Sequence, residues 1–390
     1  MKRGYDVLDL GSGMYAVVGE TDSYGDDQDV YLVLVRDSDT FTTGMPIQHA
    51  GYDFGRSFKL IPDGKFVIAG FTSDDGNNWD VFLIKTNSIF GDTLWTRRYG
   101  GGLSDMGYSV DLTDDGGFII AGNTMSFGAG DYDVYLIKTD SMGNVLWTKT
   151  YGGGGGEEGW DVEQTSDGGY IVVGRISSFG GTDNDIYLIK TDTNGDTLWT
   201  KTYGGSGQDY GRAVLQTEDG GYLVVGYTSS FGAGGFDVYV VKTDDIGNVV
   251  WTETIGGSGD DEGISVDRTP DGGYIIAGIS EGDVYVVKIT SSGIEERTYK
   301  FRLSGIDLLK CSNAFNSENI EIDYSVPENG YVNISLYNNS GRRIRTLIDR
   351  KMTSGRHRVI LQRDGLKNGV YFIRYNIGNK TGVKKLMLLK

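Results

Sequence analysis

The chain repeats one stretch of about 52 residues six times. The aromatic residue that follows the first turn of each copy recurs at steps of 51 or 52 residues, at Tyr15, Phe66, Phe118, Tyr170, Tyr222 and Tyr274. A tryptophan near the end of the copy keeps the same spacing, at Trp95, Trp147, Trp199 and Trp251. A period of this length, held over six copies, is typical of propellers, solenoids and other repeat arrays.

Each copy contains four strand-length segments. In the fourth copy they begin at Gly159, Tyr170, Asp185 and Thr197, are rich in Val, Ile, Tyr and Trp, and show no helical period. Asp-Gly and Asn-Gly turns follow the first and third segments and predict tight hairpins, whereas a long Ser/Gly/Asp loop joins the second to the third. The two middle segments are nearly continuous apolar runs, so we expect sheets that are covered on both faces.

Four-stranded antiparallel sheets stacked around an axis meet that requirement, so residues 1–303 are predicted to form a six-bladed β-propeller. A β-solenoid is the alternative, but solenoid repeats are usually shorter and lack two hairpins per unit. The first and sixth copies both lack the tryptophan, as terminal repeats of an array often differ from the others. We therefore expect these two copies to lie side by side and close the ring.

A change in charge marks a second domain. From Ser304 onward there are 15 Lys and Arg against 7 Asp and Glu, a net +8, while the first 303 residues carry −26. An acidic surface of this kind argues against nucleic acid as a partner of the propeller. Residues 304–390 contain short alternating strands, such as Ile320–Tyr324 and Val332–Tyr337, separated by turn residues. They predict a small Ig-like β-sandwich.

Several kinds of site are disfavoured by composition. Cys311 is the only cysteine, which excludes an intramolecular disulfide and a thiolate-based zinc site. His49 and His357 lie in different domains, so a Ser-His-Asp arrangement is hard to build. No apolar run is long enough to span a membrane, and no signal peptide is visible. Because the first copy lacks the glycine-rich spacer that precedes the others, we expect a longer N-terminus that carried an export signal.

Four stretches of the repeat carry a family resemblance: GGSGDDEG (256–263), DGGYIIAG (271–278), DVYLIKTD (133–140) and LWTKTYGG (198–205). They resemble the Gly- and Asp-rich β-propeller repeats of exported bacterial proteins. The resemblance implies the propeller fold and leaves the ligand open.

The C-terminal domain carries a second resemblance, in NISLYNNSGRRIRTL (333–347), NGVYF (368–372) and the closing KKLMLLK (384–390). It is similar to the Ig-like domain of flagellar hook-capping proteins and to the C-terminal sorting domain of type IX secretion. The similarity implies export across an outer membrane, with the type IX secretion machinery as partner of residues 304–390. We therefore expect an extracellular protein or one on the outer-membrane surface.

The best signal for a binding site is the position at which the copies differ. The residue after the glycine of the first segment is Tyr5, Arg56, Tyr108, Trp160, Arg212 or Ile264. If the first segment is innermost, these side chains rim the mouth of the channel on the face that carries the long loops. Aromatic residues and arginine are the types that carry recognition, and aromatic faces suit sugars. We predict ligand contacts from Tyr5, Arg56, Tyr108, Trp160 and Arg212, together with Trp79; surface drift is the alternative.

An acidic residue stands two positions before the same glycine, at Asp53, Asp105, Glu157, Asp209 and Asp261. Calcium takes oxygen ligands, so these acids are candidates for a metal site. Facing sheets lie about 10 Å apart, so any ion would be local to one loop. Capping of backbone turns is the alternative use of these acids, and no other cofactor is expected.

These observations favour a non-catalytic binding or scaffold protein that recognises a glycan or a surface protein through its loop face. The alternative is a secreted carbohydrate-active enzyme, a hydrolase or lyase that uses loop-face carboxylates. Glycoside hydrolysis needs two acids about 5 to 9.5 Å apart, and the repeated acids single out no pair. Whether the protein is an enzyme stays open at this point.

Overall fold

The computed structural model describes residues 3–11, 14–21, 29–36, 39–47, 51–87, 92–177, 183–281, 283–293, 295–301, 309–311, 314–315, 319–326, 329–338, 342–378 and 380–389. Within these ranges every regular element is a β-strand, and none is a helix that could cross a membrane. The chain forms two compact units, residues 1–301 and 302–390.

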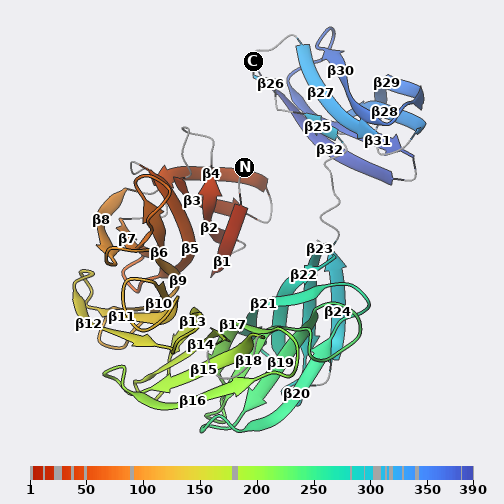
Figure 1. Ribbon diagram of the computed structural model, residues 1–390. Coiled ribbons are helices and arrows are strands. Elements are labelled where there is room, and N and C mark those ends of the chain that lie inside the picture. The colour runs from red at the N-terminus through yellow and green to blue at the C-terminus, as the bar shows by residue number, and fades with distance from the viewer. Residues whose placement is uncertain are drawn as a thin grey trace. The chain divides into compact units, whose positions relative to one another are not determined.

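The first unit contains six four-stranded antiparallel sheets, each with its strands in sequence order (Figure 1). Blade 1 comprises β1 (Arg3–Gly11), β2 (Met14–Thr21), β3 (Asp29–Arg36) and β4 (Asp39–Ile47). Blade 2 comprises β5 (Tyr52–Leu60), β6 (Phe66–Ser73), β7 (Asp80–Thr86) and β8 (Thr93–Tyr99). Blade 3 comprises β9 (Asp105–Leu112), β10 (Phe118–Thr124), β11 (Asp133–Thr139) and β12 (Val145–Tyr151).

The remaining blades repeat this plan. Blade 4 comprises β13 (Glu157–Gln164), β14 (Tyr170–Ile176), β15 (Asp185–Thr191) and β16 (Thr197–Tyr203). Blade 5 comprises β17 (Asp209–Gln216), β18 (Tyr222–Thr228), β19 (Asp237–Thr243) and β20 (Val249–Ile255). Blade 6 comprises β21 (Asp261–Arg268), β22 (Tyr274–Ser280), β23 (Asp283–Ile289) and β24 (Glu295–Phe301). The predicted six-bladed β-propeller is confirmed.

The middle strands are buried on both faces, as their continuous apolar runs predict. Every residue of β10, β11, β18 and β19 is buried. Five hydrophobic cores join blades 1 to 2, 2 to 3, 3 to 4, 4 to 5 and 5 to 6. The first strands of neighbouring blades contact one another, which places them innermost. The tryptophans of the fourth strands pack on the next blade, as the contact of Trp147 with Tyr170 shows.

The short turns between first and second strands are also built alike. The Asp167 carboxylate accepts hydrogen bonds from the Thr165 hydroxyl at 2.6 Å and from the Gly169 backbone N–H at 3.0 Å. It also accepts one from the ammonium of Lys190, a buried residue of the third strand, at 3.0 Å. Lys138 with Asp115 and Lys242 with Asp219 repeat the arrangement. We call the end of the blades that carries these turns the tight-turn face, and the opposite end the loop face.

The predicted closure of the ring is wrong for this structure. In the described part of the chain, no hydrophobic core joins blade 6 to blade 1, and Figure 1 shows the blades of this unit along an arc. In blade 6, Ile275 and Ile279 are 40% and 45% exposed. Leu223 of blade 5, which corresponds to Ile275, is fully buried because blade 6 covers it. Among the described residues, this face of blade 6 thus lacks the neighbour that covers the corresponding face of blade 5.

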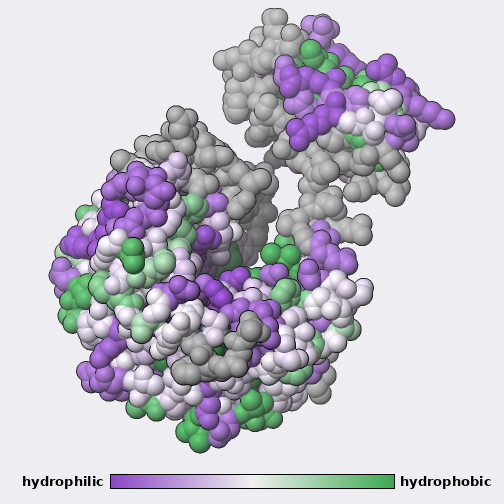
Figure 2. Space-filling model, viewed as in Figure 1, coloured by the Kyte–Doolittle hydropathy of each residue, from purple (hydrophilic) through white to green (hydrophobic). Residues whose placement is uncertain are grey.

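Exposed apolar residues on the rest of the propeller are dispersed. The fourth strands of blades 2 and 4 expose one large apolar side chain each, Leu94 and Leu198, and those of blades 3 and 5 expose two each, Val145 with Leu146 and Val249 with Val250. In the view of Figure 2 the hydrophobic surface forms separate green patches. Apolar residues that are scattered in this way are normal on a soluble surface and do not mark one large docking area.

The second unit is a two-sheet sandwich, as the sequence predicts. One sheet has the order β25 (Leu309–Cys311), β27 (Asn319–Val326), β30 (Gly355–Gln362). The other has the order β26 (Ala314–Phe315), β32 (Lys380–Leu389), β31 (Gly369–Ile377), β28 (Gly330–Asn338), β29 (Arg343–Met352). Alternating residues of both sheets, among them Ile322, Ile334, Leu361 and Ile373, form its core.

Candidate functional site

The variable position of the first strand is a β-bulge in every blade. The pairing of first and second strands skips one residue, for example between Gly159 and Asp161. The skipped residues are Tyr5, Arg56, Tyr108, Trp160, Arg212 and Ile264. Glycine before the bulge allows the two strands to approach closely: a Cβ on the facing Gly174 would lie 1.7 Å from the Glu158 carbonyl oxygen. A bulge turns its side chain away from the ladder of hydrogen bonds between the strands. The same backbone feature therefore orients all six side chains.

In blade 2 the bulge arginine lies among aromatic rings, and we call Phe54, Arg56, Phe71 and Trp79 the blade 2 cluster. The Arg56 guanidinium lies 4.0 Å from the ring centre of Tyr5 and 5.0 Å from that of Phe71. Phe54 stacks on Phe71 with ring centres 5.0 Å apart. Trp79 meets both rings edge-on, at 5.3 Å and 5.4 Å. Arg56 and Trp79 are half-buried, so the cluster is packed but reaches solvent.

A second group of the same kind lies in blade 5, and we call Tyr210, Arg212, Tyr227 and Phe236 the blade 5 cluster. The Arg212 guanidinium lies 4.1 Å from the ring centre of Trp160 and donates to the Tyr227 hydroxyl at 3.3 Å. Tyr210 and Tyr227 pack with ring centres 4.8 Å apart, and Phe236 meets Tyr227 edge-on at 5.1 Å. Cation–π contacts of this geometry fix the guanidinium without the need for a carboxylate.

Trp160 is held from several sides. Its indole N–H donates to the Glu158 carboxylate at 2.9 Å, and its ring lies 5.8 Å from that of Tyr210. Arg175 donates to the other oxygen of Glu158 at 2.5 Å and to the amide oxygen of Asn184 at 2.7 Å. Burial alone would lower the pKa of Arg175, but the bond to Glu158 outweighs it and raises the pKa. Trp160 is therefore a rigid part of the site rather than a free surface residue.

Tyr108, the bulge residue of blade 3, joins the blade 2 cluster through an edge-on contact with Phe71 at 6.0 Å. Burial raises the pKa of its hydroxyl, which stays protonated at neutral pH. Ile264 of blade 6 is half-buried. It adds an apolar side chain where the other blades have aromatic residues or arginine.

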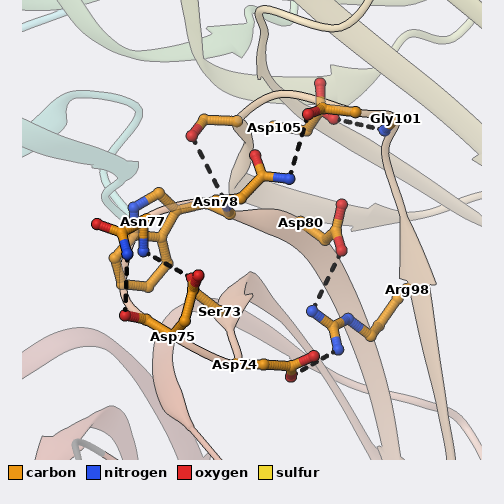
Figure 3. A network of polar contacts seen from close by, with 12 residues as sticks. Ser73, Asp74, Asp75, Asn77, Asn78, Asp80, Arg98, Gly101 and Asp105 are labelled. Carbon is orange, nitrogen blue, oxygen red and sulfur yellow. Dashed lines mark hydrogen bonds and ion pairs between the residues drawn. The ribbon is translucent and has the colours of Figure 1, made fainter.

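The loop that carries Trp79 is tied down by polar contacts (Figure 3). Asp75 accepts from the Asn77 backbone N–H at 2.9 Å, and Arg98 bridges Asp74 and Asp80. Three contacts bind this loop to the segment that leads into blade 3. The Trp79 carbonyl accepts from the Asp105 N–H at 2.6 Å, the Trp79 N–H donates to the Ser104 hydroxyl at 3.4 Å, and Asn78 donates to the Gly102 carbonyl. The loop therefore presents Trp79 from a fixed position.

Four of the five acids proposed for a metal cap backbone turns. Asp105 accepts from the Gly101 N–H at 2.7 Å, and Glu157 accepts from the Gly153 N–H at 2.7 Å. Asp209 and Asp261 accept from the glycines four positions earlier in the same way. Asp53 is buried as well. The four capping acids stabilise the loops that precede blades 3 to 6.

A second acid faces each capping acid across the loop glycine. A Cβ on Gly204 would lie 2.0 Å from an Asp185 oxygen and 2.5 Å from an Asp209 oxygen. Burial and the nearby charge of Asp209 raise the pKa of Asp185, and burial also raises the pKa of Asp80, Asp133 and Asp237. Calcium takes about six to eight oxygen ligands. In the ranges that the structure describes, no three acidic, histidine or cysteine side chains come together as a metal site, and calcium binding by these acids stays a prediction.

The sequence pointed to the bulge residues and Trp79 but missed the residues that complete the clusters: Phe54, Phe71, Glu158, Arg175, Tyr210, Tyr227 and Phe236. A signal was present, because the position after the capping acid differs between copies as much as the bulge does. It is Phe54, Met106, Glu158, Tyr210 or Glu262. The second-strand residues were hidden because they continue apolar runs that otherwise form the core.

Comparison with known proteins finds a family match at the end of the chain. Residues 316–389 match the model of the secretion system C-terminal sorting domain. The regulatory protein FlaEY of Caulobacter vibrioides is 26% identical over 204 residues, which cover 45% of this chain. The matching region spans 21% of FlaEY, about a fifth of its length.

Solved structures resemble the chain at low identity. A protein from Lactobacillus plantarum superimposes with a TM-score of 0.50 at 11% identity, over 89% of this chain and 99% of that chain. PorZ, a surface component of the type IX secretion system of Porphyromonas gingivalis, gives a TM-score of 0.40 at 10% identity, over 98% of this chain and 59% of PorZ. The Pan2 WD40 domain of Neurospora crassa gives 0.48 at 10% identity, over 82% and 86% of the two chains. Such likeness concerns the fold alone.

Proposed function

The chain ends in a type IX secretion sorting domain and is a secreted or cell-surface protein, and from this premise we propose that its propeller is a binding module. The sorting domain addresses the protein to the secretion machinery. The propeller then presents its loop face outside the cell, where it binds a glycan or a surface protein without chemical change of the ligand.

One observation carries the proposal. Six positions with the same backbone geometry hold different side chains, and four of the six are aromatic residues or arginine in direct contact across neighbouring blades. A rigid scaffold that presents variable aromatic and arginine side chains is the usual construction of a recognition surface. The tight-turn face varies less, because the same Asp, Thr and Lys residues hold the turns of blades 3, 4 and 5.

A binding screen tests the proposal. The full chain would be applied to an array of polysaccharides and to isolated outer-surface proteins, beside the variants Trp160→Ala and Asp219→Asn. We expect Trp160→Ala to lose the signal and Asp219→Asn to keep it, because Asp219 lies on the tight-turn face. Equal loss in both variants, with both still folded, would place recognition elsewhere than the loop face.

A further inference from the structure

Blades 2 and 5 carry the same cluster. Four positions correspond between them: Phe54 with Tyr210, Arg56 with Arg212, Phe71 with Tyr227, and Trp79 with Phe236. The ring geometry corresponds as well. The first pair of rings lies 5.0 Å apart in blade 2 and 4.8 Å in blade 5, and the aromatic residue at the end of the loop meets the second-strand ring at 90° and 80°.

The neighbouring blade completes each cluster in the same way. Arg56 lies over the bulge aromatic of blade 1, and Arg212 lies over the bulge aromatic of blade 4, at 4.0 Å and 4.1 Å. Each guanidinium also faces the second-strand ring of its own blade, at 5.0 Å and 5.5 Å. The loop face thus contains one arrangement twice, three blades apart.

The fold does not require this arrangement. At the four cluster positions blade 3 has Met106, Tyr108, Asn123 and Tyr132, and blade 4 has Glu158, Trp160, Arg175 and Asn184. These blades have the same strands and the same bulge. The duplication is therefore a property of the surface rather than of the repeat.

Arg56 and Arg212 differ from other arginines of this unit in how their charge is partnered. Neither Arg56 nor Arg212 forms an ion pair with any residue that the structure describes, and the Nε atom of each is buried without a hydrogen-bond partner. Yet the first 303 residues carry 47 Asp and Glu against 21 Lys and Arg. Other guanidinium groups of this unit, such as those of Arg98 and Arg175, do pair with acids. A half-buried cation without an anion costs desolvation energy, which an anionic ligand would offset.

We propose, on the basis of the binding function above, that the blade 2 and blade 5 clusters are two equivalent sites for carboxylate-bearing sugars of one polysaccharide. The planar guanidinium suits a carboxylate, to which it can donate two parallel hydrogen bonds. The surrounding rings pack against the apolar face of the sugar. A duplicated site matches a ligand that presents the same group repeatedly, which favours a polysaccharide over a folded protein. The acidic propeller favours widely spaced carboxylates over a continuous polyanion.

Hyaluronan carries a carboxylate on alternate sugars and serves as the probe, as a tetrasaccharide and as a long chain. With the tetrasaccharide, calorimetry should find two equal sites per chain. Arg56→Gln and Arg212→Gln should each remove one site and leave the affinity of the other unchanged. Arg268→Gln on the tight-turn face is the matched control and should keep both sites.

The long chain engages both sites at once, so each single variant should weaken its binding at least about tenfold through lost avidity. Arg56→Lys and Arg212→Lys keep the charge but lose the bidentate geometry, and they should bind less tightly than the wild type. The melting temperature of every variant verifies that it is folded. If the glutamine variants do not fold, the lysine variants test the role of the arginines in their place.

Several outcomes would overturn the inference. Equal binding of methyl-esterified hyaluronan would show that the neutral sugar is recognised, and equal binding of polyglutamate would show that charge alone acts. Binding of dextran sulfate but not of hyaluronan would assign the sites to sulfate esters. If calorimetry finds a single site, or two sites that neither arginine variant affects, the two clusters are not equivalent binding sites. Each of these results leaves the loop face a binding surface if Trp160→Ala still weakens the array signal, so the two proposals fail separately.

Discussion

The two faces of the propeller come from the same repeats, yet in blades 3 to 5 one is uniform and the other is not. On the tight-turn face, Asp115, Asp167 and Asp219 accept hydrogen bonds from a lysine and a threonine in the same geometry. On the loop face, the bulge position holds Tyr, Arg, Trp or Ile on an unchanged backbone. The comparison teaches that repetition marks what holds a blade together and that variation marks what the blade presents.

The largest effect is expected on the uniform face. Replacement of Asp219 by alanine leaves the ammonium of Lys242, whose side chain is 5% exposed, with the Thr243 carbonyl as its remaining partner. We expect the free energy of unfolding to fall by about 1–3 kcal/mol, because a buried charge loses its counterion. Urea unfolding measures the loss, and Asp167→Ala should give a similar value. Clearly different values for the two copies would contradict the uniformity of this face.

On the variable face, Trp160→Ala should reduce stability as well as binding. By sequence alone Trp160 is dispensable to the fold, because it does not recur; the structure revises that expectation, since Arg212, Glu158 and Tyr210 contact it. We expect a loss of about 1–2 kcal/mol, within the range of one cation–π contact and some apolar area. Trp160→Phe should recover part of the stability. An unchanged melting temperature in Trp160→Ala would show that these contacts contribute nothing in solution.

The pH dependence of the uniform face provides a smaller test. Burial alone would raise the pKa of Asp115, but hydrogen bonds from Lys138 and Thr113 outweigh it and lower the pKa to about 2. A carboxyl with a lowered folded-state pKa stabilises the fold above its unfolded pKa near 4 and loses that contribution as the pH falls toward 2. The stability difference between wild type and Asp115→Asn should therefore be constant above pH 5 and shrink below pH 4. If the stability difference between wild type and Asp115→Asn grows as the pH falls, the pKa of Asp115 is raised in the folded state rather than lowered.

The smallest effect concerns the loop of Trp79. Arg98→Gln removes the bridge between Asp74 and Asp80, two partly exposed acids. Exposed ion pairs contribute little, so we expect a loss of at most about 1 kcal/mol. Ligand binding should weaken because the loop is less ordered. Arg97→Gln is the control next to it, since Arg97 stacks on Trp95 and makes no bond to this loop. Equal effects of both variants on binding would show that the bridge does not position Trp79.

The uniform features were the ones that the sequence could predict. The 52-residue period, the Asp-Gly-Gly turn and the fourth-strand tryptophan act within one blade or between adjacent blades, so most copies show the same local pattern. The bulge positions could be found as exceptions to that repetition. Phe71 and Tyr227 could not be found in this way. In the sequence of an apolar strand, an aromatic residue that packs against the next blade cannot be distinguished from one that belongs to a cluster at the loop end.

Ring closure also lay beyond sequence reasoning. Each interface between blades rotates one blade relative to the next, and six blades close into a ring only if these rotations together complete the circle. The sequence of one copy does not reveal the total rotation. The sequence of blade 6 keeps Ile275, Ala277 and Ile279 as if a neighbour covered them, but Ile275 and Ile279 are exposed. For the acids, the sequence left metal binding and backbone capping open. The bonds of Asp105 and Glu157 to glycine N–H groups show the second use.

The bulge has a consequence for how such proteins diversify. A residue outside the strand ladder makes no demand on register, so mutation there leaves the pairing of the strands intact while it changes the side chain that the blade presents. The contacts across blades add a restriction, because Arg56 lies on Tyr5 and Arg212 lies on Trp160. Inherited changes at these positions are therefore expected in neighbouring pairs. A blade that is copied by gene duplication brings its own bulge, and with it one more position at which a lineage can acquire a new partner.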